Sequence, residues 1–118
     1  MLIRVDSQSA QPLFAQIAGA VRAEIIAGRV VEGERLPAAR DVAEALRVNL
    51  HTVLHAYQDL RDEGLVDLRR GRGAVVTAAG GALAHLRADI DRLVRAARAA
   101  GISPDTLSAL VKEAARDH

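Results

Sequence analysis

The sequence predicts a mainly α-helical fold with one small two-stranded β-sheet. Along most of the chain, apolar residues recur at intervals of three and four, which is the helical period. Glycine or proline separates the helical stretches, at Gly28, Pro37, Gly64 and Gly101. The pattern changes over residues 65–77, where two short apolar stretches flank a glycine-rich turn, as in a hairpin.

The composition excludes several classes of function. The chain has 118 residues and no cysteine, which rules out disulfides, thiolate catalysis and zinc-thiolate sites. One Phe and one Tyr are its only aromatic residues, too few for an aromatic-lined ligand pocket. No apolar run is long enough to span a membrane and no signal-peptide pattern opens the chain, so we expect a cytoplasmic protein. The net charge is +1, so any nucleic-acid binding depends on local charge.

Three helices are predicted in the first half of the chain. Residues 2–6 alternate weakly and suggest a short strand before them. The first helix covers residues 11–28, and an extended piece with a turn at Gly33 follows it. The second helix opens at Pro37, with Val42, Ala43 and Leu46 facing inward. Asn49 is a good N-cap for the third helix, and its expected buried stripe is Val53, Ala56, Tyr57 and Leu60.

The hairpin after the third helix ends in a basic tip. Val66 and Leu68 precede the turn at residues 71–73, and Val75 and Thr77 follow it. Arg69, Arg70 and Arg72 put three positive charges within four residues. Such a tip can bind phosphates or enter the minor groove of DNA, although a solvated basic turn is the plain alternative.

Together these elements predict a winged helix-turn-helix domain over residues 1–77. Only residues 47–49 separate the second and third helices, which is the length of a helix-turn-helix turn. In this architecture the third helix lies in the major groove, with its N-terminal residues at the base edges. A glycine-rich linker is expected at residues 78–82 and a two-helix dimerisation segment at residues 83–118. The predicted fold class is therefore mainly α with a small β-wing.

The DNA-binding part resembles that of GntR-type transcriptional regulators, and the short C-terminal segment resembles their YtrA-like branch. The matching positions span residues 10–77, and their combined pattern is specific although no single piece is. They are residues 33–37, Arg40, Leu46, Val48, Asn49, Thr52, Val53, Ala56, Tyr57, Leu60, Gly64, Leu65 and residues 70–73.

The resemblance implies a set of DNA-contacting residues. Arg40 would reach the DNA from the second helix, and Arg70, Gly71 and Arg72 would form the wing. The DNA-facing positions of the third helix would be Asn49, Leu50, His51, Thr52 and Leu54. The two leucines depart from the family pattern, in which basic or polar residues are common there. A leucine cannot hydrogen-bond to guanine, but it can pack on thymine methyl groups.

The two histidines of the third helix have a spacing that can bind a metal ion. His51 and His55 stand at i and i+4, but no third ligand lies nearby in the sequence, so no metal site is expected. His51 is expected to contact DNA, and His55 a phosphate or only solvent. Protonation of either would add positive charge near DNA, so binding is predicted to tighten modestly below neutral pH.

The C-terminal segment has apolar faces that so small a unit cannot bury. Dimerisation is the favoured solution, and the alternative is that the helices fold back on the winged domain of the same chain. Gly101 separates the two helices, and Ser103 with Pro104 begins the second. The expected interface residues are Leu83, Leu86, Ile90, Leu93, Leu107, Leu110 and Val111.

The sequence favours regulation of transcription over other classes of function. No catalytic cluster, no P-loop and no cofactor motif appears, so an enzyme is not expected. We expect a dimeric repressor that binds near-palindromic operator DNA through residues 49–63 and the wing; the sequence does not reveal an effector. The alternative is a winged-helix protein-interaction module, for which outward leucines would be suitable.

Overall fold

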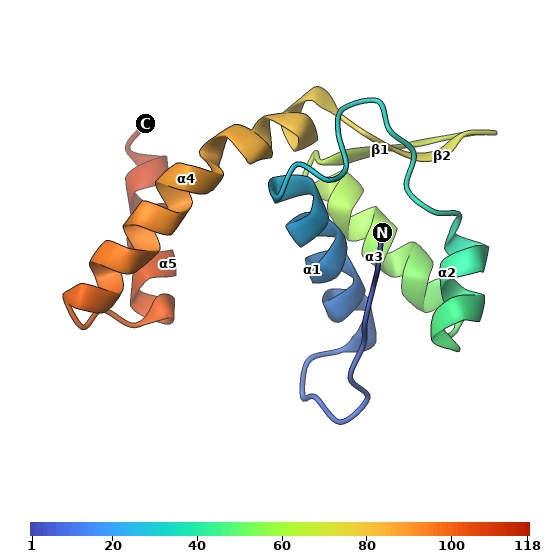
Figure 1. Ribbon diagram of the computed structural model, residues 1–118, viewed down its shortest axis with the longest axis horizontal. Coiled ribbons are helices and arrows are strands. Elements are labelled where there is room, and N and C mark those ends of the chain that lie inside the picture. The colour runs from blue at the N-terminus through green and yellow to red at the C-terminus, as the bar shows by residue number, and fades with distance from the viewer. The chain divides into compact units, whose positions relative to one another are not determined.

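Three helices, a hairpin and the start of a fourth helix make up the first of two units in the protein. The computed structural model describes residues 1–118, which divide into Met1–His85 and Leu86–His118. The elements are α1 (Leu13–Ile26), α2 (Ala39–Leu46), α3 (Leu50–Asp62), β1 (Val66–Arg69), β2 (Gly73–Val76), α4 (Ala78–Ala99) and α5 (Pro104–Arg116) (Figure 1). Their order and pairing confirm the predicted winged helix-turn-helix fold with C-terminal helices.

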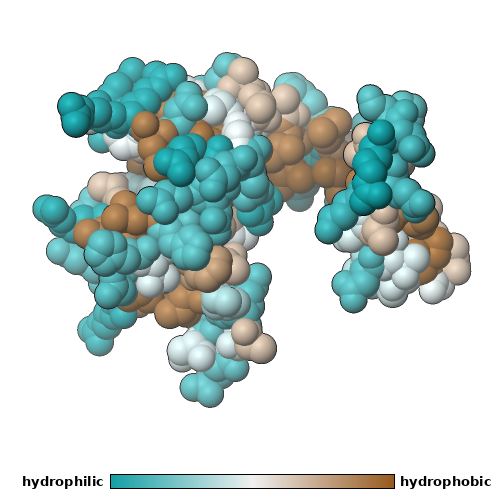
Figure 2. Space-filling model, turned by 180° about the vertical axis from the view of Figure 1, so that it is seen from behind, coloured by the Kyte–Doolittle hydropathy of each residue, from teal (hydrophilic) through white to brown (hydrophobic).

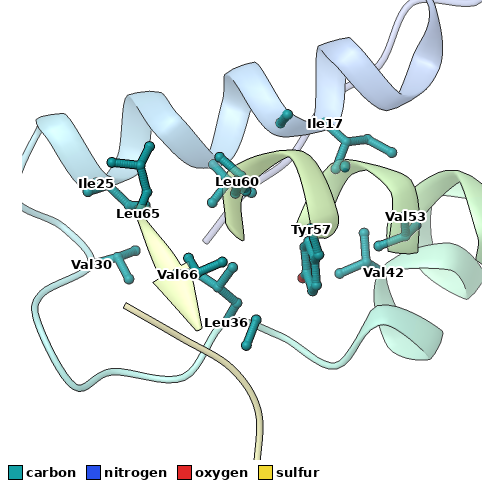
Figure 3. Packing of buried hydrophobic residues seen from close by; sticks show 14 of the residues in the cluster. Ile17, Ile25, Val30, Leu36, Val42, Val53, Tyr57, Leu60, Leu65 and Val66 are labelled. Atoms are coloured by element: carbon teal, nitrogen blue, oxygen red, sulfur yellow. The ribbon is translucent and has the colours of Figure 1, made fainter. Parts of the chain in front are cut away.

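The core of the first unit lies between α1 and α3. Ile17, Val21 and Ile25 of α1 are fully buried, and the predicted stripe of α3 is buried as expected. Figure 3 shows these two helices side by side, with Val42 of α2 and Val66 of β1 completing the cluster. Each large side chain buried in this way contributes about 2 kcal/mol, so this cluster fixes α3 against the rest of the unit.

The hairpin is antiparallel and carries a third extended segment beside it. Val66 faces Val76 and Arg69 faces Gly73, which leaves residues 70–72 as the tip of the wing. The predicted extended piece lies along β2, because Arg35 pairs with Val75 and the amide of Leu36 donates to the carbonyl of Ala74 at 2.8 Å. This pairing holds the wing against the segment that leads into α2.

Two local expectations were wrong. Residues 2–6 form no strand, because no strand edge lies beside them; instead Ile3 and Val5 pack against the core. Residues 78–82 are not a linker but the first turn of α4, which begins at Ala78. The Thr77 side chain accepts a hydrogen bond from the amide of Gly80 at 3.0 Å, which supports this helix start.

The second unit consists of the rest of α4 together with α5. The side chain of Ser103 accepts a hydrogen bond from the amide of Thr106, and Pro104 is the first residue of α5, as predicted. Ala97 is the only buried residue of this unit. The apolar residues of both helices are left largely exposed, and Figure 2 shows brown apolar surface among teal polar surface there. No helix of the protein is long and apolar enough to cross a membrane.

Candidate nucleic-acid interface

The turn between α2 and α3 sets the direction of α3, the helix expected to read the DNA. Arg47 ends α2 in the left-handed conformation, with φ of 57°, and it is the only residue besides glycine with positive φ. The amide of Val48 donates back to the carbonyl of Ala43 at 3.0 Å, which closes the turn. The Arg47 side chain is exposed next to the head of α3, so the turn carries a positive charge that sequence reasoning did not include.

Asn49 begins α3 as predicted. Its side-chain oxygen accepts a hydrogen bond from the amide of His51 at 2.8 Å. The cap uses one of the two lone pairs of this oxygen, and the NH2 group of Asn49 remains available as a donor. Asn49 is exposed and Thr52 is partly exposed, so both expected contact residues lie at the accessible end of the helix.

One face of α3 points away from the core. An α-helix turns by about 100° per residue, so His51, Leu54 and Gln58 lie within one broad face opposite the buried stripe. His51 and Gln58 are exposed and Leu54 is partly exposed. Gln58 was missed in the sequence, although its position seven residues after His51 is the signal that could have found it. Its amide can both donate and accept, as bidentate recognition of adenine requires.

Leu50 and His55 depart from their expected surroundings. Leu50 is only partly exposed and packs against the core cluster, so it is less accessible than His51. The ring of His55 stacks on Phe14 of α1, with centroids 3.7 Å apart and planes inclined by 15°. The Nε2 atom of His55 also lies 3.6 Å from a carboxylate oxygen of Asp59. The side chain of His55 is thus directed toward α1, and His51 is the better candidate for DNA contact. The structure contains no group of three or more side chains placed to hold a metal ion.

An apolar groove of about 400 Å³ separates α3 from the wing. Its walls include Leu54 and Gln58 of α3, Leu68 and Arg70 of the hairpin, and the segment before α2. At its base, the Tyr57 hydroxyl donates a 2.6 Å hydrogen bond to the carbonyl of Pro37. Burial raises the pKa of the Tyr57 hydroxyl to about 12, so the group remains a neutral donor at physiological pH. Residues of α3 and of the wing thus line opposite walls of one groove and lie on the same surface of the protein.

The wing tip is a tight turn with two unpaired arginines. The amide of Arg72 donates to the carbonyl of Arg69 at 3.1 Å, and Gly71 supplies the positive φ of 79° that the turn requires. Arg69 lies 3.5 Å from a carboxylate oxygen of Asp67, so part of its charge is neutralised within the hairpin. Arg70 and Arg72 have no such partner, and both are exposed.

The ion pairs of the first unit divide its arginines into two groups. Arg22 binds Glu63 at 2.6 Å, which raises the pKa of the guanidinium and ties α1 to the end of α3. Arg29, Arg61 and Arg69 also have carboxylate partners. The arginines without one are Arg4, Arg35, Arg40, Arg47, Arg70 and Arg72. Four of these six belong to α2, to its turn into α3 and to the wing tip, which are the elements that surround the recognition helix.

The sequence was compared with models of known protein families, and one of them matches this part of the chain. The family model for bacterial regulatory proteins of the gntR family matches residues 13–76, which contain α1, α2, α3 and the hairpin. The chain belongs to the gntR family. It is a transcriptional regulator of the winged helix-turn-helix class, as the sequence pattern predicted.

This GntR regulator is similar over nearly its whole length to a short family member. It is 28% identical to the HTH-type transcriptional repressor YtrA of Bacillus subtilis (strain 168) over 98% of this chain and 94% of that protein. Among solved structures, it resembles YtrA from Sulfolobus acidocaldarius, a GntR-family transcription factor. The TM-score is 0.63 and the identity 34%, with 80% of this chain and 99% of that chain covered.

The fold of the regulator is also that of a DNA-binding domain solved with its operator. The AraR DNA-binding domain in complex with operator has a TM-score of 0.56 and 23% identity to this chain. The match covers 65% of this chain and 94% of that domain, so it concerns the winged unit.

Proposed function

We propose that this regulator is a dimeric repressor that binds a near-palindromic operator in the bacterial cytoplasm. The head of α3 enters the major groove, and the wing tip and α2 hold the flanking phosphates. The proposed contact residues are Arg40, Arg47, Asn49, His51, Thr52, Leu54, Gln58, Arg70, Gly71 and Arg72. Such a role needs no catalytic group.

The observation that carries the proposal is the placement of the unpaired arginines. Arg40 and Arg47 lie before α3, and Arg70 and Arg72 lie on the wing beside it. Unpaired guanidinium groups on both sides of an exposed helix match the phosphates on both sides of a DNA groove. The operator complex of the AraR domain, which has the same fold, supports this assignment.

The dimer is inferred from the uncovered apolar faces of α4 and α5. No residue of α5 is buried, although Leu110 and Val111 belong to its apolar face. In α4, Leu86, Ile90 and Leu93 remain at least 40% exposed. Apolar surface of this extent within a short helical segment is typical of an interface between chains. A second copy with the same two faces would bury it, and the name of the YtrA relative agrees with the repressor role.

Selection of binding sites from random double-stranded DNA tests this proposal. The full-length protein is incubated with the DNA library at moderate salt, and bound sequences are amplified, sequenced and footprinted. We expect two inverted half-sites whose centres are about 10 bp, or a multiple of that, apart. Enrichment of a single half-site would contradict the dimer, and no enrichment at all would contradict operator binding.

A protein-interaction module is the second candidate, and the apolar groove between α3 and the wing favours it. Leu54 and Leu68 in that groove would suit an apolar partner segment. The two functions differ in salt dependence, because phosphate contacts are lost in salt and apolar contacts are not. Absence of DNA binding even at low ionic strength would favour this second function.

A further inference from the structure

The junction between β2 and α4 is held by a single side chain. The Thr77 hydroxyl donates a 2.6 Å hydrogen bond to the carbonyl of Gly64, the residue after the C-cap of α3. The same oxygen accepts a hydrogen bond from the amide of Gly80, in the first turn of α4, at 3.0 Å. The amide of Thr77 donates to the carbonyl of Leu65 at 3.0 Å. Thr77 therefore connects the end of the recognition helix, the wing and α4.

Gly80 packs directly on the backbone of the winged unit. It is buried, and a Cβ atom at this position would lie 2.4 Å from the carbonyl oxygen of Leu65. It would also lie 3.0 Å from Cγ1 of Val76. The carbonyl cannot move without disturbing its hydrogen bond from Thr77, so only glycine fits.

Gly81 is a matched comparison one residue further along α4. A Cβ atom there would meet the side chain of Glu32, with 3.1 Å between the two Cβ atoms. The backbone nitrogen of Glu32 would also lie 3.4 Å away, but Glu32 is exposed and lies in the loop between α1 and α2, so this loop can shift by a few tenths of an ångström. The two glycines therefore differ in what a methyl group would meet: a buried, hydrogen-bonded carbonyl at 2.4 Å at Gly80, and an exposed loop at 3.1 Å at Gly81.

Two adjacent glycines in a helix ordinarily suggest a flexible hinge, because glycine is a poor helix former. A hinge would make Gly80 and Gly81 equivalent, and replacing either with alanine would stiffen and stabilise α4. The close contact at Gly80 argues for the opposite role. There the missing side chain lets the helix approach the carbonyl of Leu65.

We propose that Thr77 and Gly80 form a rigid joint that holds the root of α4, residues 78–85, within the first unit, and that this joint contributes to the operator half-site spacing. The inference rests on the proposed dimer, in which α4 and α5 associate with a second copy. Each α3 would then keep one position relative to the root of its own α4, which narrows the range of separations open to the two copies of α3. Thr77 and Gly80 act here as positioning residues, since neither is among the proposed DNA contacts.

The test measures the width of the distribution of distances between spin labels on the two protomers. The chain has no cysteine, so one introduced on the exposed side of α1, Ala23→Cys, carries a single nitroxide label per protomer. Double electron–electron resonance, a pulsed EPR method, then gives the distribution of distances between the two labels. Four further variants are compared in this background: Gly80→Ala, Gly81→Ala, Thr77→Val and Thr77→Ser. Serine restores the hydroxyl that valine lacks.

We expect a narrow distribution for the parent, Gly81→Ala and Thr77→Ser, and a broad one for Gly80→Ala and Thr77→Val. We also expect Gly80→Ala to lower the melting temperature by about 4 °C or more, whereas a hinge would be stabilised by the change. If Gly80→Ala does not fold, the comparison of Thr77→Val with Thr77→Ser decides. Equal distributions for all variants of an intact dimer would overturn the joint alone, and a monomer would overturn the proposed dimer as well.

Binding to DNA supplies the functional measurement. One base pair is inserted between the half-sites of the selected operator, and affinities are compared with those for the original spacing. The parent should lose roughly tenfold in affinity, as for a mismatch in a specific site, whereas Thr77→Val should lose clearly less. A purely structural role of Thr77 would weaken binding to both spacings equally, and that result would contradict a role in spacing.

Discussion

The Tyr57 hydroxyl donates a 2.6 Å hydrogen bond to the carbonyl oxygen of Pro37, which joins the middle of α3 to the segment before α2. Tyr57 is also part of the core, so one side chain packs the recognition helix inward and holds the start of α2 beside it. Because of this bond, we expect Arg40 of α2 to keep a fixed position relative to the exposed face of α3. Two parts of one DNA-binding surface need such a fixed position.

Replacing the hydroxyl of Tyr57 tests this bond. We expect Tyr57→Phe to lower the free energy of unfolding by about 1 kcal/mol, because the partner carbonyl loses its donor. Chemical denaturation followed by circular dichroism at neutral pH measures the change. A variant as stable as the parent would show that the bond contributes nothing to the fold.

The same residue predicts a loss of stability in alkali. Burial raises the pKa of Tyr57 to about 12 in the folded protein, whereas an unfolded tyrosine titrates near pH 10. A raised pKa stabilises the fold fully below about pH 10, and this contribution disappears as the pH rises to about 12. Tyr57→Phe should lack this loss of roughly 3 kcal/mol, so the parent should lose its advantage and the two stability curves should cross in alkali.

Leu54 is predicted to recognise a thymine methyl group. It lies between His51 and Gln58 on the exposed face of α3 and cannot form a hydrogen bond. Replacing the contacted thymine with uracil removes one methyl group and should weaken binding about fourfold. Leu54→Ala should bind more weakly and show no difference between thymine and uracil. If every uracil substitution in the operator has no effect on the parent, the apolar contact is not made.

Arg47 is predicted to lower the stability of the fold and to raise the affinity for DNA. Its left-handed backbone costs about 1–2 kcal/mol for a residue with a side chain, and glycine avoids that cost but loses entropy on folding. Arg47→Gly should therefore be more stable by about 0.5–1 kcal/mol and yet bind operator DNA more weakly. Arg47→Asn, which tolerates this conformation without a charge, is the control for affinity. Undiminished binding by both variants would exclude a phosphate contact at Arg47.

The dimer is tested by placing a charge on the apolar face of α5. Leu110 is 48% exposed within one chain, so Leu110→Asp should not harm the fold of a monomer. In a dimer it would bury an unpaired carboxylate, and the protein should sediment as a monomer. Ala109→Asp adds the same group about 100° further round the helix and should remain dimeric. Sedimentation velocity distinguishes the outcomes, and a dimeric Leu110→Asp would contradict the proposed interface.

Most of the winged fold could be predicted from the sequence because its signals are local. The i, i+4 spacing of α1, the cap at Asn49 and the glycine turn of the wing each appear within a few residues, and the structure confirms them. The membership of the gntR family was likewise predicted from motifs and is confirmed.

The features that the sequence did not show depend on contacts distant in sequence. The glycines at residues 80 and 81 suggested a linker, because nothing nearby shows that Gly80 packs on Leu65. The partly buried position of Leu50 and the stacking of His55 on Phe14 depend on how α3 packs against other segments. The pairing of Arg69 with Asp67 could have been suspected, since alternate residues of a strand share a face.

The most direct test of the central claim is the salt dependence of binding to the selected operator. Fluorescence anisotropy of the full-length protein is measured over a salt series, with scrambled DNA of equal length as control. Eight arginine–phosphate contacts in a dimer, from Arg40, Arg47, Arg70 and Arg72, predict a slope of log K against log salt of about −7. Arg72→Ala should reduce that slope by about 2 in a dimer, and Arg29→Ala, whose side chain is paired with Glu24, should leave it unchanged. A shallow slope, or equal affinity for the operator and the scrambled DNA, would contradict recognition of an operator by α3 and a basic wing.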